Sequence, residues 1–424
     1  MAKPLSRGCG WRPYPRCEDA RVDGLVRLDE IEAARELLRD VAVVTPVEGS
    51  RPLSRKVGGD VLLKCENLQR TGSFKIRGAY VRIVRLTDEE RARGVVAASA
   101  GNHAQGVALA ASLTGAKSKI FMPAGAPLPK IEATKAYGAD IELTGLTVDD
   151  ALVAARAYAE DHGAVLIHPF DHRDVIAGQG TVGLEIADAV PQARTVVVCM
   201  GGGGLVSGVA AAVKARLSGV RVVAVQAEAA AAFPHSLAVG HPVALETMST
   251  IADGIAVATP GEITLRHVAQ LVDDVVTVSE ESLSRALLLC LERAKLVVEP
   301  AGVAAVAAIS DDPGAFEPPV VAVLSGGNMD PVLLMRVIRH GMIAAGRYLS
   351  FRLRIPDHPG ELARLLALLA DTGSNVLDVE HLRTGPKLHL DEVEVALQLE
   401  TRGPDHCDEV LGRLRAAGYP LLFG

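Results

Sequence analysis

The chain has 424 residues, of which 49% are apolar and 22% charged, and it carries a formal net charge of −7. This composition excludes a largely disordered chain, and the net charge argues against a general nucleic-acid binder. No apolar run approaches the ~18 residues needed to cross a bilayer, so we expect no membrane partner.

The N-terminal segment, residues 1–25, is predicted to be a loose tail. It is basic, rich in proline and glycine, and has no apolar stretch typical of a signal peptide. The cysteines are scattered without CxxC spacing, which indicates reduced thiols in a cytoplasmic protein and not a zinc site. They are Cys9, Cys17, Cys65, Cys199, Cys290 and Cys407.

The following region, residues 26–338, is predicted to be an α/β domain. It begins with an amphipathic helix over Leu28–Val41 and an extended segment over Val61–Gln69. A β-rich run, a glycine-rich or polar turn and an alanine-rich helix then recur. This order predicts parallel sheets flanked by helices. The clearest units are residues 94–115 and 195–228, and a last buried strand is predicted within residues 319–330.

The C-terminal region differs in pattern from the rest of the chain. After a linker at residues 339–348, an alternating strand is followed by a turn at Pro356–Gly360 and by a helix. Two further strands, a helix over His406–Ala417 and a last short strand complete the series. The order βαββαβ predicts a ferredoxin-like domain over residues 349–424.

Four glycines, Gly201 to Gly204, separate a predicted strand from a helix. Their backbone N–H groups and the helix dipole would favour a bound phosphate. A turn without a ligand is the first alternative. A dinucleotide site with Glu228 as the ribose-binding acid is the second, although Ser207 stands where the third glycine of that fingerprint belongs.

Two further motifs follow predicted strands. SAGNHAQG (Ser99–Gly106) opens a helix, and helix capping alone does not account for Ser, Asn, His and Gln within one turn. These donors suit a bound carboxylate. SGGN (Ser325–Asn328) lies at the carboxyl end of an apolar strand, where ligands bind in open α/β sheets. Lys75, in TGSFKIRGAY, is a candidate nucleophile.

Taken in chain order, Lys75, SAGNHAQG, the four glycines and SGGN resemble the motifs of the fold-type II pyridoxal-phosphate enzymes, and among them the threonine and serine dehydratases. The resemblance covers about residues 28–338 and implies two parallel-sheet lobes. It implies that Lys75 forms a Schiff base with the cofactor, that Asn102 bonds the ring oxygen and that Ser325 faces the pyridine nitrogen. The other residues implied in cofactor binding are Phe74, Gly201, Gly202, Gly203, Gly204 and Leu205. Those implied in holding the substrate carboxylate are Ser99, Gly101, Asn102 and His103.

The chemistry of these residue types agrees with the resemblance. Desolvation lowers the pKa of an amine and so provides the neutral form that attacks a carbonyl. The cofactor is an electron sink for negative charge at Cα. A serine opposite the pyridine nitrogen leaves that nitrogen largely unprotonated, which favours prompt loss of a β-substituent. The expected products are a 2-oxo acid and ammonia.

Three positions separate this chain from its neighbours in the family. Threonine synthases carry an aspartate where Ile76 stands, and serine racemases carry a second serine where Ala100 stands. Family members that bind a divalent cation use a glutamate, here Glu228, and an aspartate six residues later. Pro234 occupies that second position, so we predict no metal at this site.

The C-terminal domain resembles an ACT domain, a module that binds amino acids in metabolic enzymes. The resemblance places an effector at the turn from Asp357 to Gly360 and near Asn375 and Val376. A purely structural or tetramerising domain is the alternative. Because ACT modules usually pair, the resemblance implies a homo-oligomer, either a dimer or a tetramer.

The resemblance thus implies a cytoplasmic dehydratase acting on L-threonine, and on L-serine as a second substrate. The products would be 2-oxobutanoate or pyruvate, together with ammonia. The implied role is the first step of isoleucine biosynthesis, regulated by an amino acid. An L-serine ammonia-lyase or a racemase is the alternative within the family. A non-catalytic amino-acid sensor and a nicotinamide oxidoreductase are the alternatives outside it.

Overall fold

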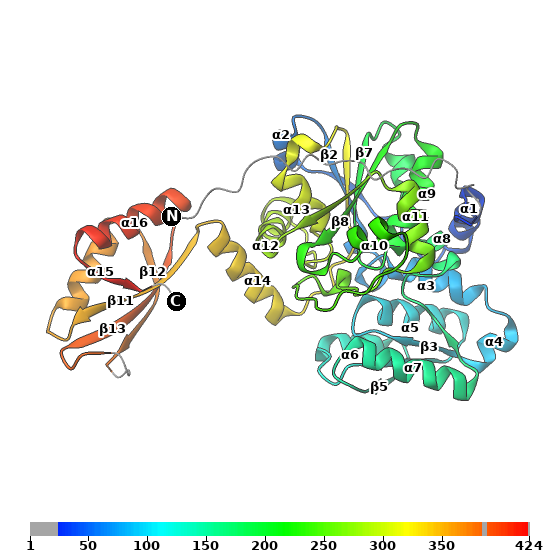
Figure 1. Cartoon of the computed structure of the whole chain (residues 1–424), viewed down its shortest axis with the longest axis horizontal. Coiled ribbons are helices and arrows are strands. Elements are labelled where there is room, and N and C mark those ends of the chain that lie inside the picture. The colour runs from blue at the N-terminus through cyan, green and yellow to red at the C-terminus, as the bar shows by residue number, and fades with distance from the viewer. Residues whose placement is uncertain (1–23, 384–387, 423–424) are drawn as a thin grey trace. The chain divides into compact units, whose positions relative to one another are not determined.

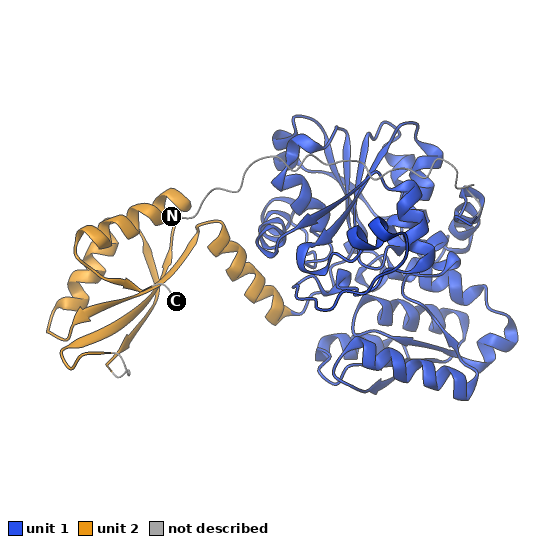
Figure 2. Ribbon diagram, viewed as in Figure 1, with its two compact units in different colours: residues 1–330 blue, residues 331–424 orange. Residues whose placement is uncertain are grey.

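A computed structural model describes residues 24–383 and 388–422 (Figure 1). Residues 1–23 of the predicted tail, with Cys9 and Cys17, lie outside the described residues. The chain divides into two compact units, Met1–Asp330 and Pro331–Gly424 (Figure 2). Helix α14 (Pro331–Ala344) opens the second unit, so it runs through residue 338 and into the segment that was predicted to be a linker.

The larger sheet of the first unit has six strands in the order β1-β2-β10-β7-β8-β9. All neighbouring strands are parallel except the pair β1 and β2. Strands β7 and β10 are buried at every position, as expected for parallel strands covered by helices on both faces. The strands are β1 (Val47–Gly49), β2 (Val61–Cys65), β7 (Thr195–Cys199), β8 (Arg221–Ala227), β9 (Asp274–Val278) and β10 (Val320–Leu324).

A second, four-stranded sheet forms the other lobe of the first unit. Its order is β5-β4-β3-β6, and all its strands are parallel. The strands are β3 (Val95–Ala98), β4 (Ser118–Met122), β5 (Asp140–Leu143) and β6 (Val165–Leu166). Helices α5 (Asn102–Thr114), α6 (Leu128–Ala136) and α7 (Val148–His162) accompany this sheet (Figure 1). The predicted architecture of two parallel-sheet lobes is confirmed.

Helices α8 (Arg173–Ala189) and α9 (Gly204–Arg216) pack tightly on each other in the first unit. A Cβ atom at Gly208 would lie 2.3 Å from the carbonyl oxygen of Ile176, so only glycine permits this approach. Helix α1 (Leu28–Leu37) ends short of the predicted Val41. The other α-helices of this unit are α2 (Arg51–Val57), α3 (Lys75–Val84), α4 (Asp88–Arg93), α10 (Phe233–Val239), α11 (Glu262–Leu271), α12 (Glu280–Leu289) and α13 (Ala304–Asp311).

A buried ionic network anchors the first turn of α3. The Arg77 guanidinium, 1% exposed, donates to both carboxylate oxygens of Glu66 at 2.8 Å and to Glu185 Oε1 at 2.6 Å. Lys64 Nζ lies 2.5 Å from Glu185 Oε2. The network joins β2, α3 and α8, and it therefore fixes the start of α3 against the large sheet.

The second unit has the predicted βαββαβ order after α14. Its antiparallel sheet has the strand order β12-β13-β11-β14. One face is apolar and packs against α15 and α16, with Leu365, Val395 and Leu414 fully buried. The elements are β11 (Tyr348–Pro356), α15 (Glu361–Asp371), β12 (Asn375–Leu382), β13 (Glu392–Glu400), α16 (Pro404–Ala416) and β14 (Leu421–Leu422). This fold fits an ACT domain.

Across residues 24–383 and 388–422, the structure contains no helix with the length and apolarity that a membrane span requires.

Candidate active site

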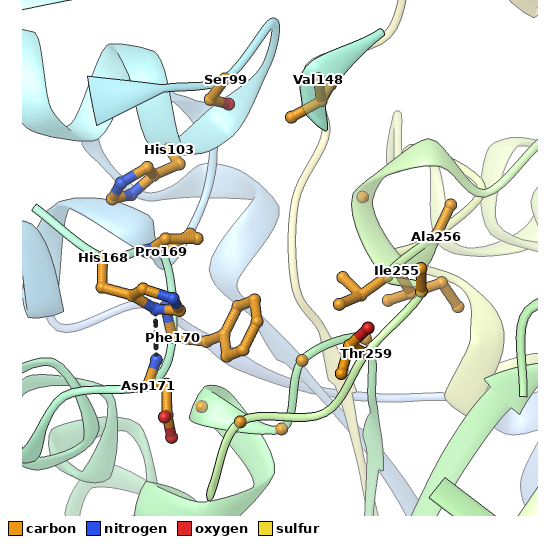
Figure 3. Close-up of a pocket in the computed structure, with 18 of the residues that line it drawn as sticks. Ser99, His103, Val148, His168, Pro169, Phe170, Asp171, Ile255, Ala256 and Thr259 are labelled. Carbon is orange, nitrogen blue, oxygen red and sulfur yellow. Dashed lines mark hydrogen bonds between the residues drawn. The ribbon is translucent and has the colours of Figure 1, made fainter. Parts of the chain in front are cut away.

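A cavity of about 1250 Å³ lies in the first unit. Figure 3 shows Ser99, His103 and His168 on one side of it and Ile255, Ala256 and Thr259 on the other. Every residue of the first unit that was predicted to bind cofactor or substrate lines this cavity. These are Phe74, Lys75, Ser99, Gly101, Asn102, His103, Gly201, Gly202, Gly203, Gly204, Leu205 and Ser325.

The topology explains why these separate motifs meet. Ser99, Gly201 and Ser325 each follow the carboxyl end of a parallel strand, β3, β7 and β10 respectively. In open α/β sheets ligands bind at this end of the strands. Helices α5 and α9 begin at the same place, so the positive ends of their dipoles are directed toward the cavity.

Backbone pairing brings the Lys75 segment to the SGGN turn. Ser73 and Gly326 form an isolated antiparallel β-bridge, and the Phe74 N–H donates to the Ser325 carbonyl oxygen at 3.2 Å. The Gly327 N–H donates to the Gly72 carbonyl oxygen at 2.9 Å. These bonds hold the lysine and the serine on one wall of the cavity.

Lys75 is the first residue of α3, and its amine lies at the cavity. Its Nζ donates to the Pro169 carbonyl oxygen at 2.9 Å and lies 5.2 Å from the centroid of the Phe74 ring. Burial lowers the pKa of this amine to about 8, although the nearby Cys199 and Glu299 oppose the shift. The neutral, nucleophilic amine is therefore accessible near neutral pH.

The tetraglycine loop is closely packed against other parts of the unit. Gly203 has φ +91°, and a Cβ there would lie 2.7 Å from Cζ of Phe233. A Cβ at Gly202 would lie 2.3 Å from the ring of Phe170, which Figure 3 shows directed into the cavity. The first N–H groups of α9 have no partner within the helix and remain for an anion. This loop therefore fits a phosphate group.

The start of α5 offers donors from the backbone and from Ser99. Ser99 Oγ accepts from the Gly101 N–H at 3.1 Å, which leaves its own hydroxyl proton for a ligand. The His103 ring is 5% exposed and its Nε2 lies 2.8 Å from the Ile167 carbonyl oxygen. Burial lowers the pKa of this imidazole to about 3, so it is neutral and Nε2 donates. His103 thus offers a ligand its backbone N–H and not a positive charge.

The segment from His168 to Asp171 was not predicted to belong to the site. His168 Nδ1 accepts the Asp171 N–H at 2.8 Å, which leaves the ring proton on Nε2, and burial lowers the pKa of the ring to about 4. Figure 3 shows this bond as a dashed line. Pro169 and Phe170 contact the lysine and the tetraglycine loop respectively. The crowding of histidine, aspartate and phenylalanine in one short stretch was the available signal.

Glu299 was also missed, although it lines the cavity and is only 3% exposed. Its Oε1 accepts from Asn102 Nδ2 at 2.7 Å. Burial, reinforced by the charge of Asp253, raises the pKa of Glu299 to about 7. A single acidic residue within the apolar stretch LVVEPAG was the signal in the sequence.

The second unit contains a separate, smaller cavity of about 430 Å³ at the turn between β11 and α15. Asp357 and Gly360 line it, whereas Asn375 and Val376 are not among its lining residues. Arg383 and His381, which were not predicted, also line it, and Arg383 Nε lies 3.0 Å from Asp357 Oδ2.

Comparisons with known proteins agree with this geometry. Residues 38–326 match the family model described as pyridoxal-phosphate dependent enzyme. An L-threonine ammonia-lyase from Thermotoga maritima is 45% identical over 94% of this chain and 99% of its own length. A catabolic L-threonine dehydratase, TdcB, from Staphylococcus aureus N315 is 42% identical over 75% of this chain and 93% of its own.

Among solved structures, maize serine racemase is similar with a TM-score of 0.70. It is 37% identical and covers 73% of this chain and 96% of its own. The available amine of Lys75, the glycine loop at the start of α9 and the donors of α5 fit pyridoxal phosphate and an amino-acid carboxylate. The family match excludes the dinucleotide interpretation of the glycine motif. The chain therefore belongs to the pyridoxal-phosphate dependent enzymes, in the group that includes the L-threonine ammonia-lyases.

Proposed function

We propose that this chain is a threonine ammonia-lyase, which converts L-threonine to 2-oxobutanoate and ammonia and accepts L-serine to give pyruvate. The observation that carries the proposal is the position of the Lys75 amine. It lies, with its lowered pKa, in one cavity with the SAGNH turn and the tetraglycine loop. The name of the T. maritima relative and its 45% sequence identity to this chain support the choice of substrate.

The groups that line the cavity have separate roles in the proposed reaction. The N–H groups at the start of α9 would hold the cofactor phosphate, Asn102 would donate to the ring oxygen, and Ser325 would bind at the pyridine nitrogen. Bound pyridoxal phosphate supplies the electron sink for charge that develops at the substrate Cα. The Ser99 hydroxyl and the first N–H groups of α5 hold the substrate carboxylate. The neutral amine of Lys75 would take the α-proton of the substrate, and its lowered pKa suits this transfer near neutral pH.

The test is an assay of 2-oxo-acid release from L-threonine and L-serine by the purified enzyme. The Lys75→Ala variant should lose turnover and the visible absorbance of the covalently bound cofactor while its fold persists. Undiminished 2-oxo-acid release by this variant would refute the assignment of Lys75 as the catalytic residue. Wild-type protein that binds the cofactor but releases no 2-oxo acid would favour the amino-acid sensor instead.

Racemisation is the second candidate, because maize serine racemase has a similar structure. Ala100 opposes it. This residue lines the cavity and offers no hydroxyl that could exchange a proton at Cα. We expect 2-oxo-acid release from L-serine to exceed by far the formation of D-serine, which chiral analysis of the residual serine measures. D-serine formed at a comparable rate would reverse the order of the two candidates.

A metal-free site beside Glu228 stays a prediction.

We infer that the second unit is an ACT-type regulatory domain whose effector is an amino acid. Its fold and the cavity beside Asp357 and Gly360 support this inference, while Asn375 and Val376 remain proposed from resemblance alone. The Arg383 guanidinium, which is ion-paired with Asp357, would be the cation that meets an effector carboxylate in this cavity. Feedback by isoleucine would make this the first step of isoleucine biosynthesis, whereas the name of the S. aureus relative favours a catabolic role.

Regulation is tested with the full chain by measuring turnover with and without isoleucine or valine. Direct binding of each amino acid to wild-type protein and to Asp357→Ala should accompany any change in turnover. Binding that is identical in the variant, or absent in both proteins, would leave the domain a structural one. We also propose a homo-oligomer and a cytoplasmic location, which sedimentation and cell fractionation test.

A further inference from the structure

Asn102 is held on both ends of its side-chain amide. Nδ2 donates to Glu299 Oε1 at 2.7 Å, and Oδ1 accepts from Asn328 Nδ2 at 2.9 Å. Asn328 is itself fixed because its Nδ2 also donates to the Thr71 carbonyl oxygen. An asparagine amide can rotate by half a turn and exchange donor for acceptor, so its partners determine which end faces a ligand.

This arrangement leaves one N–H of Asn102 for a ligand in the cavity. The amide nitrogen has two hydrogens and Glu299 accepts one of them. The opposite orientation would place the carbonyl oxygen of Asn102 against the carboxylate of Glu299 and its NH₂ against that of Asn328. With Glu299 ionised, both contacts would then pair like groups.

Glu299 is itself positioned by the backbone around the SGGN turn. Its N–H donates to the Gly326 carbonyl oxygen at 3.0 Å. A Cβ at Gly326 would lie 2.3 Å from Glu299 Oε1, so this glycine makes room for the carboxyl group. The Glu299 carboxyl group, which is buried and held by these contacts, has little freedom to move away from Asn102.

We propose that Glu299 is a positioning residue that, with Asn328, orients the Asn102 amide so that an N–H and not a carbonyl oxygen faces the cofactor ring oxygen. The proposal rests on the contact of Asn102 with the cofactor given under the proposed function. A ring oxygen that carries negative charge requires a donor, and reversal of the amide would present an acceptor.

The protonation of Glu299 gives this arrangement a measurable signature. Desolvation and the charge of Asp253 raise its pKa to about 7, while its bond from Asn102 and the charges of Lys130 and Lys75 act in the opposite direction. Lys130 and Asp253 form an ion pair at 2.7 Å and both line the cavity. The cofactor absorbance should therefore change with pH as Glu299 titrates.

The experiment compares Glu299→Gln and Glu299→Ala with wild type in three measurements. These are cofactor affinity from titration of the apoenzyme, absorbance of the holoenzyme as a function of pH, and thermal unfolding of the apoenzyme. None of them requires a substrate, so a failure to release 2-oxo acid would count against the proposed function alone. Glu262→Gln is the matched control, because Glu262 lines the same cavity but is exposed.

Glutamine retains a carbonyl acceptor but does not titrate. We expect Glu299→Gln to bind the cofactor within about threefold of wild type and to lose the absorbance transition near neutral pH. Glu299→Ala leaves the Asn102 donor without its acceptor and should weaken cofactor binding about tenfold or more. The transition should persist in Glu262→Gln, with a lower midpoint in Asp253→Asn and a higher one in Lys130→Met.

Equal weakening in the glutamine and alanine variants would overturn the proposal, as would wild-type affinity in Glu299→Ala. If the alanine apoenzyme does not fold, the pH titration decides. A transition that is lost in Glu299→Gln and retained in Glu262→Gln supports the proposal, and one retained in both refutes it.

Discussion

Replacement of Lys75 by methionine should stabilise the apoenzyme while it abolishes activity. The lysine amine is buried and its pKa falls from 10.5 to about 8 on folding. At neutral pH the folded chain must therefore hold a desolvated ammonium group, which opposes folding. Methionine has similar length and carries no charge, so the variant removes this cost.

The pKa shift sets an upper limit on the effect. A difference of about 2.5 between 10.5 and 8 corresponds to about 3.4 kcal/mol at 1.36 kcal/mol per pKa unit. Lys75 borders a large open cavity, so solvent screening reduces the expected gain to about 1–2 kcal/mol. Between pH 8 and pH 10.5 the unfolded chain binds more protons at this site than the folded chain does. Wild-type stability therefore rises with pH across this window, and the advantage of the variant shrinks.

Urea denaturation of both apoenzymes between pH 7 and pH 10.5 measures this difference. The free energy of unfolding of Lys75→Met should exceed that of wild type most at pH 7 and converge with it near pH 10.5. Lys117→Met is the matched control, since Lys117 is exposed and its loss should produce no such convergence. A gain that is independent of pH, or a destabilised variant at pH 7, would refute the reasoning.

Two further predictions concern the supports of the site. Gly203→Ala should lower apoenzyme stability by about 2–4 kcal/mol and weaken cofactor binding. The reason is that residue 203 has a left-handed φ and that its new Cβ would clash with Phe233. Thermal unfolding measures the stability, and cofactor titration measures the binding. Gly219→Ala, with φ +72° but open space around it, should cost only about 1–2 kcal/mol, and equal losses would contradict the steric argument. Arg77→Met should destabilise the chain by about 3–5 kcal/mol in urea because it leaves the buried Glu66 carboxylate without its guanidinium, and a loss below about 1 kcal/mol would contradict this.

The parallel sheets were predictable because their buried strands are short, apolar runs followed by glycine or polar turns. The same regularity identified Ser99, Gly201 and Ser325, since each follows such a strand and parallel strands end at one edge. The tetraglycine loop was conspicuous because a run of four glycines occurs nowhere else in the sequence.

The rest depended on contacts that no local pattern encodes. Glu299 lies nearly 200 residues from Asn102, and only the folded chain shows that their side chains meet. Helix α14 continues past the predicted boundary at residue 338 because no proline interrupts its sequence there. The buried ring of His103 also depends on a distant partner, the carbonyl oxygen of Ile167.

The position of β10 in the large sheet has a consequence for biosynthesis. This strand is the last of the first unit in the sequence, yet it lies between β2 and β7 at the centre of the sheet. During translation β2 and β7 emerge from the ribosome long before β10 does. Until β10 emerges, the strand edges that it will pair with have no partner. We therefore expect the large sheet, and with it the cavity at its carboxyl edge, to be completed only after β10 has left the ribosome.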